Sequence, residues 1–129
     1  KWPLAGSGEA QTMGGVSKDL ETVLKPSATI LDAMSEAEFQ RLVVAGLKQR
    51  GYLVWHVVDA RLMAAGLPDV IAAHPTRVPR RLLMWELKRA KGGRVSPEQK
   101  AALAALSDVF GVDARVLRPA DWLLAKELL

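Results

Sequence analysis

From Ser35 onward, apolar residues recur first at a helical period and then at a strand period, and this alternation restricts the chain to a mixed α/β fold. A chain of 129 residues has the size of one domain with a single core. The expected order is a helix, three strands, a second helix, a fourth strand and a closing helix. The corresponding ranges are 35–51, 52–58, 69–73, 81–88, 96–111, 112–117 and 119–129.

Two of the expected helices begin with the pattern of a capping box. Ser35 stands three residues before Glu38, and Ser96 stands three residues before Gln99. Pro97 suits the first helical position after Ser96. Glu38 and Gln99 therefore have two open interpretations, a cap or a functional side chain. The second helix is expected to bury a stripe, which consists of Leu103, Leu106 and Phe110.

Residues 1–34 lack the periodic pattern and carry scattered glycine and serine residues. We expect an extended or partly disordered arm there, with a short helix over 18–24, and a single folded domain over 35–129. No segment resembles a signal peptide, and no apolar run approaches the roughly 18 residues of a membrane span. The expected location is therefore intracellular and soluble, in the cytoplasm of a bacterial host or associated with the nucleoid.

The net charge of +4 is distributed unevenly along the chain. Between residues 77 and 94 there are seven basic side chains and one acidic side chain, so this segment carries +6 while the rest carries −2. Positive charge concentrated in this way favours the phosphates of a nucleic acid. From charge alone we expect DNA contacts from Arg77, Arg80, Arg81, Arg89, Lys91 and Arg94.

Three charged side chains lie on or beside the second and third expected strands. Asp69 opens the second strand, and Glu86 and Lys88 stand two apart on the third, so a strand period places both on one face. If the two strands are neighbours, the carboxylates of Asp69 and Glu86 converge. The ordinary alternatives are a turn residue at Asp69 and an exposed polar edge for the Glu-x-Lys pair.

Two carboxylates at close range repel each other unless a cation lies between them. Mg²⁺ or Mn²⁺ suits such a site of oxygen ligands, and we expect Asp69, Glu86 and the backbone carbonyl of Leu87 to bind it. The bound cation activates water and offsets charge on a phosphodiester, with Lys88 beside the water. This arrangement predicts hydrolysis of phosphodiester bonds.

Other kinds of site are disfavoured by residue counts. The chain has no cysteine, which excludes thiolate chemistry, and two histidines are too few for a histidine-based zinc site. His56 is interpreted as a core histidine. Trp55 and Trp85 are interpreted as core residues and not as platforms for stacked bases.

Three motifs in this order resemble the PD-(D/E)XK nuclease superfamily: Gly66-Leu67-Pro68-Asp69, Glu86-Leu87-Lys88 and Ser96-Pro97-Glu98-Gln99. The similarity is closest to the virus-type replication-repair nuclease branch, the VRR-NUC domain, and covers about residues 35–117. It implies a restriction-endonuclease-like fold, metal binding by Asp69 and Glu86, a catalytic Lys88 and a site contact from Gln99. It also implies that Glu38, on the first helix, supports the metal.

The resemblance implies an Mg²⁺- or Mn²⁺-dependent DNA endonuclease that works in DNA repair or recombination, in a phage or its host. It further implies a homodimer that acts on branched DNA such as a Holliday junction or a flap. Two alternatives of other classes stay open. One is a nucleic-acid-binding module that keeps the fold without catalysis, and the other is a structural assembly protein.

Overall fold

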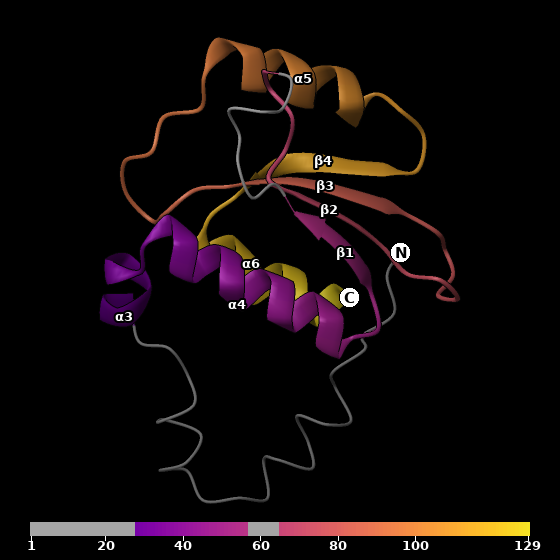
Figure 1. Ribbon diagram of the computed structural model, residues 1–129, viewed down its shortest axis with the longest axis horizontal. Helices are drawn as coiled ribbons and strands as arrows, with labels where there is room; N and C mark the ends of the chain where they lie inside the picture. Colours follow the sequence, from indigo (N-terminus) through magenta and orange to yellow (C-terminus); the bar gives the residue numbers. More distant parts are fainter. Residues whose placement is uncertain (1–27, 57–64) are drawn as a thin grey trace, which may run out of the picture.

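The computed structural model describes residues 28–56 and 65–129, and these form a four-stranded sheet with helices on both faces (Figure 1). The expected strands are found at β1 (Leu53–His56), β2 (Val70–Ala73), β3 (Leu82–Leu87) and β4 (Val112–Leu117). Residues 57 and 58 of the expected first strand, and the expected helix over 18–24, lie outside the described residues. The order of elements from α4 onward is the predicted one.

The strands lie side by side in the order β1-β2-β3-β4. The first two neighbouring pairs are antiparallel, whereas β3 and β4 are parallel and are joined through the helix α5. The sheet is therefore mixed, and with its flanking helices it has the α/β restriction-endonuclease-like architecture that the sequence predicted. Because β1 and β3 run in the same direction, the carboxyl ends of both strands lie at one end of the sheet.

The helices begin where the sequence predicted. In α4 (Glu36–Gln49) the Ser35 side chain accepts a hydrogen bond from the Glu38 backbone N–H, and the Ser35 N–H donates to Glu38 Oε1, both at 3.1 Å. In α5 (Pro97–Ser107), Ser96 and Gln99 make the same pair of bonds. The closing helix α6 (Pro119–Ala125) is shorter than expected, because a 3₁₀ turn, η2 (Lys126–Leu128), replaces its last part.

One face of the sheet carries the hydrophobic core under α4 and α6 (Figure 1). Trp85 and Leu87 of β3 point into this core, as the strand period predicted. The Trp85 ring meets the Trp122 ring of α6 edge-on, with centroids 6.4 Å apart. Gly46 of α4 allows this packing, because a Cβ atom there would lie 2.4 Å from the Trp122 ring.

Several burial predictions were wrong. Trp55 and His56 of the edge strand β1 are exposed, and Trp55 keeps 55% of its surface. Phe110 is fully exposed, because α5 ends at Ser107 before its buried stripe reaches that residue. Only Leu103 of the expected stripe is fully buried.

The part of the expected arm that the structure describes is also different from the prediction. Residues 28–33 form a helix, α3 (Ala28–Ala33), in which Leu31 is buried, and α3 packs against α6. Burial of Leu31 explains why this segment is ordered although its sequence pattern is weak. Among the described residues, none of the helices has the length and apolar character needed to cross a membrane.

Candidate active site

The residues predicted to carry chemistry lie at the carboxyl end of β3, next to the N-termini of α4 and α5 (Figure 1). Asp69 lies there as well, between the buried Pro68 and the first residue of β2. Its Oδ2 accepts a hydrogen bond of 2.8 Å from the backbone N–H of Leu87. Gly66 allows the approach, because its φ is +89° and a Cβ atom would lie 2.7 Å from the Glu98 carbonyl oxygen.

Glu86 is at the centre of the site and is almost completely buried, with 2% of its surface exposed. Its Oε2 accepts a hydrogen bond of 2.7 Å from the Gln99 side-chain amide of α5. The ammonium group of Lys88, itself buried, lies 3.3 Å from the same oxygen. The structure therefore brings Asp69, Glu86, Lys88 and Gln99 together, and it rules out an exposed edge as the environment of the Glu-x-Lys pair.

Gln99 has both of the roles that the sequence left open. Its Oε1 accepts a hydrogen bond from the Ser96 N–H at 2.9 Å and so closes the capping box, while its Nε2 donates to Glu86. A glutamate would close a capping box equally well but has no amide hydrogen to donate. The choice of glutamine at this position is thus explained by Glu86.

Burial, and after it the nearby negative charge of Asp69, raise the pKa of the Glu86 carboxyl to about 7. The positive charge of Lys88 opposes this shift without cancelling it. A raised pKa is expected where two carboxylates lie close together in a site that is partly shielded from water. A proton or a cation at this position would relieve the repulsion.

The residues present fit a hard divalent cation. Glu86 Oε1 is buried and has no hydrogen-bond partner in the described part of the chain, so one acceptor is left for a ligand. Residues 28–56 and 65–129 contain no cluster of three or more His, Cys, Asp or Glu side chains placed to hold a metal. The ligands expected from the sequence, Asp69, Glu86 and the Leu87 carbonyl, would leave the other positions to water and substrate oxygens, as Mg²⁺ accepts.

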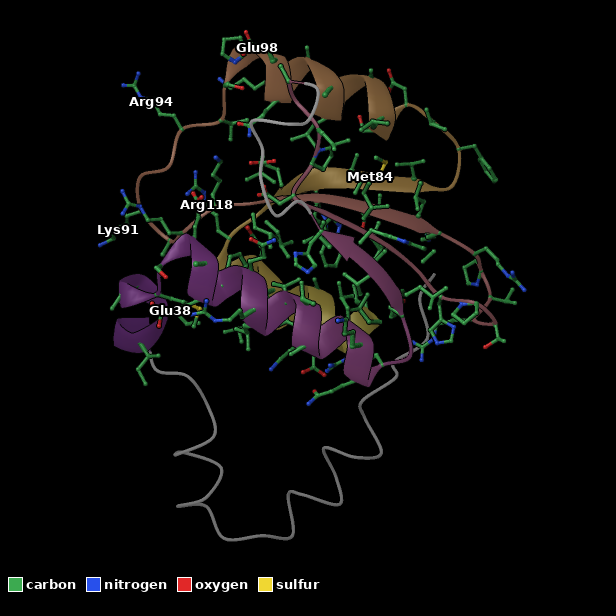
Figure 2. The ribbon with its side chains drawn as sticks, viewed as in Figure 1. Glu38, Met84, Lys91, Arg94, Glu98 and Arg118 are labelled. Atoms are coloured by element: carbon green, nitrogen blue, oxygen red, sulfur yellow. The ribbon has the colours of Figure 1, made fainter. Side chains whose placement is uncertain are left out.

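Of the two interpretations left open for Glu38, the structure shows the cap. Glu38 caps α4 and is exposed at the start of that helix (Figure 2), and its bond to Ser35 holds the pKa of its carboxyl below the usual value. Glu36, two residues earlier, lies 3.9 Å from the Lys88 ammonium instead. Both residues are in the first turn of α4, but side chains two apart on a helix point in different directions.

The basic segment is divided between the two ends of β3. Arg89, Lys91 and Arg94 follow the strand and lie exposed at the site end, where Figure 2 shows Lys91 and Arg94. Arg77, Arg80 and Arg81 precede the strand, about 17 Å away at roughly 3.3 Å per residue. The predicted DNA contacts of these three arginines would therefore lie away from the site end, because a hairpin places its loop at the start of the second strand.

Arg118 is a site-end residue that the sequence reasoning missed. It follows β4, and its Nη1 donates to the carbonyl oxygens of Arg89 at 2.6 Å and Gly92 at 2.9 Å (Figure 2). Gly92 and Gly93 both have positive φ, so the turn needs glycine and is held by Arg118. A Cβ atom on Gly93 would lie 2.9 Å from Glu36 Oε1, which places this turn beside the site.

Replacement of Gln99 by glutamate tests the contact with Glu86. We expect Gln99→Glu to keep helix α5, because the cap survives, and to destabilise the metal-free protein by several degrees more at pH 8 than at pH 5. The reason is that a third carboxylate repels Glu86 only when both are ionised. Thermal melts in EDTA at the two pH values measure this difference. An equal loss at both values would contradict the contact.

No protein-family model matches the chain, and neither the curated proteins nor the solved structures contain a significant match.

Proposed function

We propose that this protein is a metal-dependent endonuclease that hydrolyses phosphodiester bonds of DNA. The observation that carries the proposal is the convergence of Asp69, Glu86 and Lys88 at the end of β3, with Lys88 Nζ 3.3 Å from Glu86 Oε2. The restriction-endonuclease-like architecture and the resemblance to the VRR-NUC domain agree with it, and we propose membership of that branch. Structural ion pairs also occur in proteins, but a buried carboxylate with an unpaired oxygen is unusual in them.

Each residue has a separate task in the proposed reaction. Mg²⁺ or Mn²⁺, when bound, activates water and offsets negative charge on the phosphate. Asp69 and Glu86 would bind the metal ion through their carboxylate oxygens, and Gln99 fixes the orientation of Glu86. Lys88 holds the attacking water and stabilises its deprotonated form. The water attacks phosphorus directly, so no covalent intermediate with the protein forms.

The substrate proposed is DNA, contacted at the site end by Arg89, Lys91 and Arg94, which are exposed and follow the catalytic strand. By resemblance we further propose a homodimer that cuts branched DNA symmetrically. The second candidate is a nucleic-acid-binding module without catalysis. The intact set of Asp69, Glu86 and Lys88 favours the enzyme, since a module that only binds has no need of buried paired carboxylates.

The proposal is tested by incubating end-labelled linear, flapped and four-way-junction DNA with the purified chain. We expect cleavage in Mg²⁺ or Mn²⁺, none in EDTA, and fragments with the length of internal cuts on a denaturing gel. Binding of the same DNA without cleavage in either metal would favour the binding module. Binding to none of them would contradict both candidates.

A further inference from the structure

The two faces of the sheet are covered unequally. The face under α4 and α6 carries the core, but on the other face α5 packs against β4, at one edge (Figure 1). No other described helix lies on that side of β1 and β2. As a result, Leu53 and Trp55 of β1 keep 53% and 55% of their surface exposed. Isolated apolar residues on a surface are ordinary, but two on one strand face beside an uncovered sheet are not.

The carboxylates of the candidate site lie on this same face, where Glu86 is buried beside α5. In the strand register Trp55 lies opposite Ile71, and Ile71 lies opposite Met84, which points to the α5 side (Figure 2). Glu86 is two residues beyond Met84 on β3, so its side chain is on the same face, about 7 Å further along the strand. Trp55 thus lies two strands away from β3, level with a residue two positions before Glu86.

An exposed aromatic ring and an arginine lie at the far end of the same face. The row of Leu53, Ala73, Leu82 and Val112 runs across all four strands there, and it lines a cavity of ≈ 600 Å³. Phe110 and Arg80 line this cavity too. Phe110 is fully exposed, and Arg80 is exposed to solvent as well. Arg80, for which the sequence predicted a DNA contact, thus lies at the end of this face away from Glu86.

We propose that this surface, called the open sheet face and defined by Leu53, Trp55, Arg80 and Phe110, binds an unpaired stretch of the DNA strand that enters the site. This inference rests on the proposed nuclease function and deepens it by naming the substrate class, DNA with single-stranded character next to the cut. Trp55 and Phe110 stack on bases, whose π faces accept any sequence, and Arg80 contacts a phosphate.

A second copy of the chain is the competing occupant. Aromatic residues and arginine are common in protein interfaces too, but the cavity beside Leu53 and Phe110 is lined by arginines and, among the described residues, by no acidic residue that could pair with them in a second copy, whereas phosphates would. Continuity with Asp69 and Glu86 also favours a substrate strand, because a partner protein on this face would cover the approach to the site. The charge and the continuity together favour nucleic acid.

The test measures binding of the full chain to fluorescein-labelled oligo-dT and to a blunt duplex by anisotropy, in EDTA so that cleavage plays no part. We expect Trp55→Ala and Phe110→Ala each to weaken oligo-dT binding about tenfold and duplex binding much less. Trp55→Phe keeps a stacking ring and should bind like wild type. Leu124→Ala is the matched control, since Leu124 is 74% exposed on α6, over the opposite face.

Unchanged oligo-dT binding in both alanine variants would overturn the proposal. A shift of the alanine variants from dimer to monomer in light scattering would also overturn the proposal, because that result would assign the face to self-association. Failure of the nuclease function looks different: oligo-dT binding then depends on Trp55 while no DNA is cut in Mg²⁺ or Mn²⁺. Conversely, cleavage that requires Lys88, together with oligo-dT binding that does not change in Trp55→Ala, would contradict the proposed role of the open sheet face but not the nuclease function.

Discussion

Lys88→Ala is expected to reduce DNA cleavage by about 10²- to 10³-fold while DNA binding in EDTA stays within about twofold of wild type. The ammonium group of Lys88 lies 3.3 Å from Glu86 Oε2 and is buried, so no other described side chain can replace it beside the attacking water. Removal of one positioned charge from a site shielded from water lowers the reaction rate by about this factor when that charge stabilises charge that develops during the reaction.

The control for this loss is Lys100→Ala, which removes a lysine of equal charge from the exposed surface of α5, one residue after Gln99. We expect Lys100→Ala to cleave within about twofold of wild type, because exposed charges at a distance are screened by salt. First-order rate constants from single-turnover cleavage, with circular dichroism to confirm folding, give the comparison. Equal rates for Lys88→Ala and wild type would contradict the mechanism.

The elements and the grouping of Glu86, Lys88 and Gln99 could be predicted because their signals are local. Serine three residues before Glu38 or Gln99 fixes the start of a helix through its own hydrogen bonds. The strand period alone places Glu86 and Lys88 opposite Trp85 and Leu87. Only the convergence with Asp69 needed an assumption, namely that the two strands are neighbours.

The parts that failed depend on tertiary geometry. Glu38 was expected as a possible metal support, and only the position of Lys88 relative to α4 shows that Glu36 lies beside Lys88 instead. The DNA contact of Arg80 was expected from charge alone, and only the antiparallel hairpin shows that Arg80 lies at the other end of β3 from Glu86. Burial of Trp55 depended on how far α5 extends across the sheet, which no local pattern records.

Glu86→Gln is expected to have opposite effects on activity and stability. It removes a proposed metal ligand, so cleavage should fall below detection in Mg²⁺. In metal-free buffer at pH 8 the same variant should melt several degrees above wild type, because a neutral amide in this position avoids both the burial of a charge and the repulsion from Asp69, which together raise the pKa of Glu86 to about 7.

The sign of the pH dependence follows from the same shift. Between the ordinary value of 4.5 and about 7, the unfolded chain has released the Glu86 proton while the folded protein still holds it. The folded state therefore binds more protons in this range, and the stability of the wild type falls as pH rises from about 4.5 to 7. In Glu86→Gln this part of the decline should be absent.

Mg²⁺ should reverse the penalty in the wild type, since a cation beside Glu86 and Asp69 favours the ionised carboxyl. We expect saturating Mg²⁺ at pH 8 to raise the melting temperature of the wild type by several degrees, by the linkage of ligand binding to folding, and to leave Glu86→Gln nearly unchanged. Lys100→Ala should respond like the wild type. The same Mg²⁺ response in Glu86→Gln and wild type would show that the ion binds elsewhere, whatever the cleavage assays give.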